Sequence, residues 1–214
     1  MRKLSSVAKT GIMTAAGIAA AVGLAASPAS AAGTWTVSGS TGSGGAFTAS
    51  ATKPVLKDAN TGTTLTCASS AATGTAPNGT GLSGTNIAAI NTVTFATCTG
   101  PAGISFTVAS QSLPWHLNAV SYSGGVTTGT LTGVRAKLTG LCNATFAAPS
   151  GVNNGATLTG SYNNATHTLS ISGASALKAY SVSGICLGLI NNNDLASFTA
   201  AYVVSPSTLK ITSP

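Results

Sequence analysis

Carboxylates, histidines and cysteines carry most acid–base and metal chemistry in proteins, and this chain has few of them. Among its 214 residues there is no glutamate, and the acidic residues are Asp58 and Asp194. The histidines are His116 and His167. A metal cage or a general acid–base pair needs several such groups together. The composition therefore disfavours metal and acid–base chemistry, and we expect no metal and no cofactor.

A serine hydrolase is the enzyme class that the composition leaves open, because serines are plentiful. Its serine needs a histidine base and usually a carboxylate that orients the histidine. The base would be His116 or His167, the carboxylate Asp58 or Asp194, and no Gly-x-Ser-x-Gly elbow occurs. A glycosidase would need both aspartates as its flanking carboxyls. Both lie in asparagine-containing segments that predict turns, so we expect the protein not to be an enzyme.

Exposed aromatic rings next to amides and hydroxyls would instead suit glycan binding. The densest local cluster is Pro114-Trp115-His116, and Tyr122 follows closely. Trp115, His116 and Tyr122 are therefore the candidate ligand platform. A competing prediction places Trp115 in the core, because it shares the alternation of Leu117 and a lone tryptophan in a β-sandwich is usually buried.

Four cysteines, Cys67, Cys98, Cys142 and Cys186, are the last group with distinctive chemistry. An even count in an exported protein predicts two disulfides. Four cysteines allow three pairings, and pairing between sequence neighbours would join Cys67 to Cys98 and Cys142 to Cys186. A zinc site is disfavoured, because no Cys-x-x-Cys spacing occurs and neither histidine is near a cysteine in the sequence.

The first 31 residues are typical of a secretory signal. Their basic residues are Arg2, Lys3 and Lys9. An apolar stretch follows over residues 12–26, and Ala29-Ser30-Ala31 is a small-x-small cleavage site. We expect cleavage after residue 31, which leaves residues 32–214. The mature chain shows no lipid-attachment cysteine after the apolar stretch and no hydrophobic anchor, so we expect an extracellular protein without membrane contact after cleavage.

The positive charge of the chain is spread thinly. The formal net charge is +7 for the whole sequence, but three of the basic residues belong to the predicted signal. The remaining basic residues are Lys53, Lys57, Arg135, Lys137, Lys178 and Lys210. Nucleic-acid binding requires a clustered basic stripe. Scattered cations do not provide one, so we expect no nucleic-acid partner.

Alternation of apolar and polar residues recurs along the mature chain and predicts half-buried antiparallel strands. Two clear examples are Ile104 to Val108, where serine and threonine alternate with apolar residues, and Val134 to Leu138, where Arg135 and Lys137 do so. Asparagine- and glycine-containing turn signals separate the runs, for example Gly124-Gly125. No segment shows a sustained helical period. The prediction is an all-β fold, an antiparallel sandwich or barrel stabilised by two disulfides.

No linker divides the mature chain, so we predict one all-β domain over residues 32–214. Its two halves resemble each other weakly: each has two cysteines followed by a Ser-Phe-Thr strand, at 105–107 and at 197–199. This pattern is either an old duplication or a chance result of biased composition.

Two stretches carry a resemblance to known proteins. One is residues 53–70, Lys-Pro-Val-Leu-Lys-Asp-Ala-Asn-Thr-Gly-Thr-Thr-Leu-Thr-Cys-Ala-Ser-Ser, and the other runs from Leu-Pro-Trp-His-Leu at 113 to Lys137. Together with the alanine-rich signal and the closing Ile-Thr-Ser-Pro, they resemble a group of small secreted actinobacterial proteins over nearly the whole chain. The resemblance implies export and supplies no catalytic residues.

The functional expectation is therefore a secreted, non-catalytic protein that acts by binding or assembly in the extracellular space or at the cell wall. Its partner would be a cell-wall polymer, a polysaccharide or a second copy of the chain. Low charge and many β-branched residues make pairing between strand edges a route to assembly. A glycan-binding module is the alternative function, and a serine hydrolase is the least favoured one.

Overall fold

The computed structural model describes residues 34–214, and the predicted signal over residues 1–31 lies outside them. The described residues confirm the all-β prediction, with one short 3₁₀ turn at Pro101–Gly103. The strands are β1 (Trp35–Ser38), β2 (Ala46–Thr52), β3 (Val55–Asp58), β4 (Thr64–Thr75), β5 (Gly79–Leu82), β6 (Ala88–Thr99), β7 (Ser105–Gln111), β8 (Trp115–Ser123), β9 (Val126–Gly140), β10 (Cys142–Ala147), β11 (Ala156–Asn163), β12 (Thr168–Gly184), β13 (Leu195–Ser205) and β14 (Lys210–Thr212). Among residues 34–214, no helix is long and apolar enough to cross a membrane.

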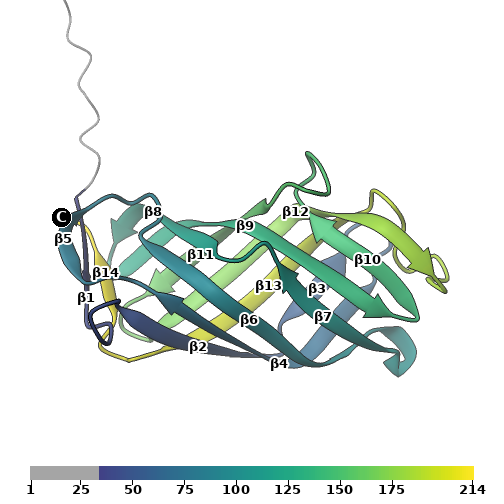
Figure 1. Cartoon of the computed structure of the whole chain (residues 1–214), viewed down its shortest axis with the longest axis horizontal. Coiled ribbons are helices and arrows are strands. Elements are labelled where there is room, and N and C mark those ends of the chain that lie inside the picture. Colours follow the sequence, from purple (N-terminus) through teal and green to yellow (C-terminus); the bar gives the residue numbers. More distant parts are fainter. Residues whose placement is uncertain (1–33) are drawn as a thin grey trace, which may run out of the picture. The chain divides into compact units, whose positions relative to one another are not determined.

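The main sheet closes on itself to form a barrel, in which every pairing is antiparallel (Figure 1). The order around the ring is β9, β11 with β10, β12, β13, β2 with β3, β4, β6, and β8 with β7, which returns to β9. These are eight positions, and three of them hold two short strands end to end. A barrel of eight strands has an interior that side chains nearly fill or that holds one small ligand.

Backbone chemistry explains two of the positions that hold two short strands. Lys53, with φ of 50°, and Pro54 separate β2 from β3. Ser112, with φ of 57°, and Pro114 separate β7 from β8. Proline has no N–H to donate to a neighbouring strand, and a positive φ bends the chain out of the extended conformation. The long strands on either side continue past both interruptions.

Side chains alternate between the barrel interior and its outer surface, as the sequence pattern predicts. On β9, Val134 and Leu138 are buried, whereas the side chains of Arg135 and Lys137 lie on the outer surface. Much of the interior is alanine. Buried alanines include Ala49, Ala51, Ala72, Ala88, Ala144, Ala156, Ala179, Ala196 and Ala200. Small interior side chains let the strands close around little apolar volume, and they leave part of the interior unfilled.

A small sheet of β14, β1 and β5 covers one end of the barrel (Figure 1). Hydrogen bonds attach its last strand to the barrel. Tyr162 Oη donates to the carbonyl of Leu209 at 2.9 Å, and Thr127 Oγ1 donates to the carbonyl of Ile211 at 2.8 Å. Asn164 exchanges two hydrogen bonds with the backbone of Ile211, both at 2.9 Å. We call these three strands the closing sheet.

Two disulfides join sequence neighbours, which settles the pairing that the sequence leaves open. Cys67 on β4 is bonded to Cys98 on β6, its direct cross-strand partner, with a sequence separation of 31. Cys142 on β10 is bonded to Cys186, which follows β12, with a separation of 44. Disulfides persist in oxidising compartments such as the extracellular space.

Removing each disulfide separately tests whether a buried disulfide stabilises the fold by more than loop closure alone. The two loop lengths differ little, so the chain-entropy model assigns about 4 kcal/mol to each bond. Cys67 and Cys98 are both buried, whereas Cys186 is only partly buried. We expect the double variant Cys67→Ala with Cys98→Ala to lose more stability in urea unfolding than Cys142→Ala with Cys186→Ala, because it also leaves a core cavity. Equal losses would contradict this expectation.

The closing sheet makes stability sensitive to alkaline pH through Tyr162. Burial raises the pKa of Tyr162 from its usual 10.0 to about 12. The unfolded chain therefore ionises first, so the stability that Tyr162 contributes is complete below pH 10 and decreases between pH 10 and about 12. We expect Tyr162→Phe to cost about 1 kcal/mol at pH 9, through the lost hydrogen bond. Urea unfolding at pH 11 to 12 should show a smaller stability difference between the wild type and Tyr162→Phe. A difference that stays constant with pH would contradict the role of Tyr162 ionisation.

Candidate functional site

Asp58 stabilises a turn, as its sequence context predicts. It ends β3, and the backbone N–H groups of Asn60 and Thr61 both donate to Asp58 Oδ1 at 2.9 Å. The side chain is 3 % exposed, and Asp58 Oδ2 has no hydrogen-bond partner. Oδ1 thus closes a tight turn, whereas Oδ2 is buried without a hydrogen-bond partner.

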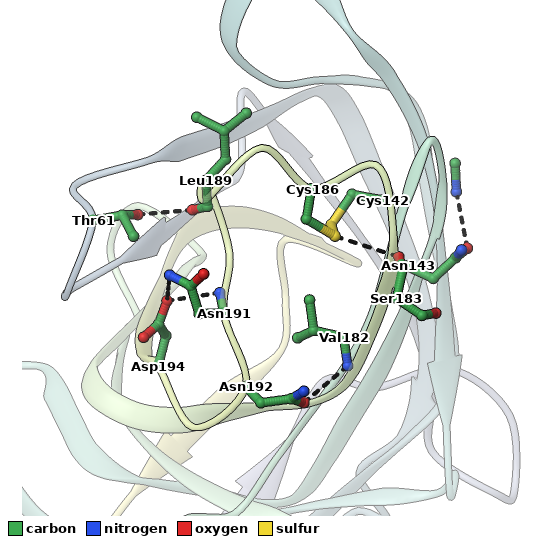
Figure 2. The surroundings of a disulfide bond; sticks show 11 residues. Thr61, Cys142, Asn143, Val182, Ser183, Cys186, Leu189, Asn191, Asn192 and Asp194 are labelled. Carbon is green, nitrogen blue, oxygen red and sulfur yellow. Dashed lines mark hydrogen bonds between the residues drawn. A yellow bond between two sulfur atoms is a disulfide. The ribbon is translucent and has the colours of Figure 1, made fainter.

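Asp194 has the same role in the segment before β13. The backbone N–H of Asn191 donates to Asp194 Oδ2 at 2.8 Å, and the Asn191 side-chain amide donates to it at 3.0 Å (Figure 2). A hydrogen bond also joins the turn after Asp58 to the segment before Asp194. Thr61 Oγ1 donates to the carbonyl of Leu189 at 2.8 Å (Figure 2). Both carboxylates therefore organise loops beside the Cys142–Cys186 disulfide.

The histidines lie apart from these aspartate turns. His116 is half-buried on β8, and His167 is half-buried in the turn between β11 and β12, with φ of 53°. Within residues 34–214, no side-chain hydrogen bond joins either imidazole to a serine or an aspartate. In the same range, no three His, Cys, Asp or Glu side chains are grouped as metal ligands.

The predicted ligand platform is not assembled on one face. Trp115 is 5 % exposed, and its indole N–H donates to the carbonyl of Gln111 at 2.9 Å. The burial corrects the platform role of Trp115 and agrees with the competing core position, because a buried ring cannot stack on a sugar. His116 follows it on the strand and therefore points to the opposite face. Tyr122 is half-buried and packs against the core.

Three exposed apolar residues are the chain neighbours of Cys142 and Cys186. Leu141 is 58 %, Ile185 63 % and Leu187 76 % exposed. The backbone N–H of Ile185 donates to the carbonyl of Leu141 at 2.7 Å, which holds two of them together. Because the barrel is closed, its ring strands within residues 34–214 offer no free edge for pairing with another chain. Assembly would rely on this apolar group or on the edges of the closing sheet.

The barrel interior contains an apolar cavity of about 80 Å³. Phe95, Val108, Ala136 and Phe198 all line it and are only partly buried, although they face the interior. The Phe95 and Phe198 rings pack edge to face, with centroids 6.2 Å apart. We call this space the larger cavity. Among the residues that the structure describes, no charged side chain lines it.

A smaller apolar cavity of about 50 Å³ lies next to the closing sheet, where Leu209 and Ile211 line it. Leu169 lines both cavities and therefore stands between them. Its cross-strand partner is Tyr202 on β13, which lines the larger cavity. The two cavities thus occupy successive levels of the barrel.

A buried pair of hydroxyl groups, from Ser70 and Tyr202, lies beside the larger cavity. Tyr202 Oη and Ser70 Oγ are hydrogen-bonded at 2.9 Å, and Ser70 Oγ also donates to the carbonyl of Thr94 at 2.9 Å. Ser70 is 2 % exposed and Tyr202 7 %. Burial raises the pKa of the Tyr202 phenol, and the hydrogen bond with Ser70 lowers it in part. The phenol is therefore neutral at physiological pH.

A groove of about 500 Å³ lies on the outer surface of the barrel. Its lining includes the hydroxyl and amide side chains of Thr48, Thr73, Thr75 and Asn91, and no charged residue. Sequence reasoning missed both the cavities and this groove, because each depends on which strands become neighbours. The one available signal is the alternation of Tyr202 with Ala200 and Val204, which predicts an inward phenol.

Comparisons with protein-family models, with curated proteins and with solved structures find no match for this chain.

Proposed function

We propose that this protein is an exported, non-catalytic binding protein whose barrel interior holds a small apolar molecule. The observation that carries the proposal is the larger cavity. Four of its inward-facing side chains, Phe95, Val108, Ala136 and Phe198, stay partly uncovered inside the barrel. Interiors are normally packed as densely as organic crystals, and empty apolar space forfeits contacts that a fitting molecule would restore.

The lining decides the chemical class of the ligand. A charged or strongly polar molecule would lose its hydrogen bonds to water and find almost no replacement among these side chains. A hydrocarbon has no hydrogen bonds to water to lose when it enters the cavity. Engineered apolar cavities of about 150 Å³ stay dry and bind benzene or xenon. The larger cavity has about half that volume, so its occupant is small, or side chains such as Leu169 move to admit a longer one.

Extracellular action fits the same proposal. The two disulfides suit an oxidising compartment, and the predicted signal would direct the chain there. Apolar molecules dissolve poorly in water, so a protein that encloses them would retain them outside the cell or at the cell wall. The residues in this role are those that line the cavity, and none needs to change its protonation state.

Binding of benzene and xenon tests the proposal directly. We expect both to shift the methyl resonances of Val108, Leu138 and Ala136 in NMR spectra of the exported protein, with millimolar affinity. Ala136→Leu should weaken binding at least tenfold, because the longer side chain occupies the larger cavity.

Ala109→Leu is the matched control. Ala109 is exposed on β7, so the same change there adds volume outside the barrel and should leave binding unchanged. Interior methyl resonances that stay unmoved by saturating benzene and by pressurised xenon would refute the proposal.

Glycan binding is the second candidate, and the hydroxyl and amide side chains in the outer groove are the observation that favours it. Hydroxyls and amides of Thr48, Thr73, Thr75 and Asn91 line the groove without any charge. Such groups can exchange hydrogen bonds with sugar hydroxyls. Cell-wall polymers and polysaccharides would be the ligands, as the sequence predicts. The groove lies outside the barrel, so this function and cavity binding can be separated by mutation.

Polysaccharide retention tests the second candidate. We expect Thr48→Val with Thr75→Val to reduce co-sedimentation with purified cell-wall polysaccharide several-fold, because each change removes a hydroxyl and keeps the side-chain shape. Benzene binding should be unaffected. Wild-type protein that does not sediment with the polymers would exclude this function.

A further inference from the structure

The hydrogen atoms of the Ser70–Tyr202 pair can be assigned from the chemistry of its partners. A serine hydroxyl has one hydrogen, and the carbonyl of Thr94 can only accept. Ser70 therefore donates its hydrogen to the Thr94 carbonyl, at 2.9 Å. The bond between Ser70 and Tyr202, also 2.9 Å, then has Tyr202 as its donor. Both hydroxyl hydrogens are used inside the protein.

This assignment fixes what Tyr202 can offer to a ligand. A phenol oxygen that has donated its hydrogen still has acceptor lone pairs. Tyr202 lines the larger cavity and is the cross-strand partner of Leu169, which separates the two cavities. The wall of the larger cavity thus includes a phenol whose oxygen keeps acceptor capacity, while both hydroxyl hydrogens of the Ser70–Tyr202 pair are already used.

We propose that the barrel interior selects small apolar molecules that carry one hydroxyl group, with that hydroxyl donating to Tyr202 Oη. This inference rests on the proposed binding of apolar molecules and adds the ligand class. An aliphatic alcohol satisfies the acceptor and fills the apolar space with its carbon chain. A ketone or an ether of the same size brings only acceptors, which would face the phenol oxygen without a hydrogen between them. A carboxylate is excluded by its charge.

The neutral state of Tyr202 supports the assignment of the phenol as the donor to Ser70. Burial raises the pKa of the phenol above its usual value, so the Tyr202 hydrogen remains on the bond to Ser70 at neutral and mildly alkaline pH. Selection should therefore not change over the range in which an extracellular protein works.

The test compares butan-2-ol with butan-2-one, which have nearly the same size and differ in the hydrogen that the alcohol donates. Their affinities are measured by NMR titration of the interior methyl groups in the wild type, Tyr202→Phe and Ser70→Ala, with benzene as the reference ligand. Because each affinity is compared between proteins, the different solubilities of the two compounds cancel.

Opposite effects are expected from the two substitutions. Tyr202→Phe removes the acceptor and should lower the affinity for butan-2-ol about fivefold while that for butan-2-one stays unchanged, since one neutral hydrogen bond corresponds to about two- to tenfold in affinity. Ser70→Ala releases the Tyr202 hydrogen, so the affinity for butan-2-one should rise by about the same factor. A merely structural role for the pair would not reverse the preference between the two ligands.

Benzene separates this inference from the proposed function. If benzene binds all three proteins equally but the alcohol affinity survives Tyr202→Phe, or the ketone gains nothing from Ser70→Ala, the hydroxyl selection is overturned and the apolar cavity function stands. If benzene fails to bind the wild type, the proposed function itself fails, and the selection fails with it. Circular dichroism of both variants verifies that the barrel is intact.

Discussion

Closure of the main sheet is the constraint that the other features share. In a ring, each strand finds backbone partners on both sides, so no long edge needs protection by charge. This explains how a chain with two acidic residues and an outer surface of threonine and serine can form long strands such as β9 and β12. Closure also sets the interior diameter through the strand number. With alanine at many interior positions, that diameter leaves the two cavities.

Local features of the fold were predictable from sequence, because they depend on near neighbours along the chain. Alternation identified the strand faces of Val134 to Leu138, and glycine pairs such as Gly124-Gly125 marked a hairpin. The choice between sandwich and barrel was not predictable, since it depends on the pairing of β12 with β13, which returns the sheet to its start. Such long-range pairings leave no periodic pattern in the sequence.

The candidate site was less predictable than the fold. On β4, Cys67 is buried, Ser69 is exposed and Ser70 is buried, so the alternation shifts by one residue between them. A strict period of two from Cys67 would put Ser69 inside and Ser70 outside. The hydroxyl that contacts Tyr202 therefore lies at a position where the simple pattern fails. The role of the aspartates, in contrast, followed from the turn residues around them, because an Asx side chain bonds to nearby backbone N–H groups.

The closing sheet places the two ends of the described chain side by side: β1 pairs with β14, and Val37 lies opposite Ile211. During synthesis β1 appears long before β14, because translation proceeds from the N-terminus. The closing sheet therefore stays incomplete, with β1 paired to β5 alone, until residues 210–212 have been made. The hydrogen bonds that attach β14 to the barrel can thus form only after every strand of the ring has been synthesised.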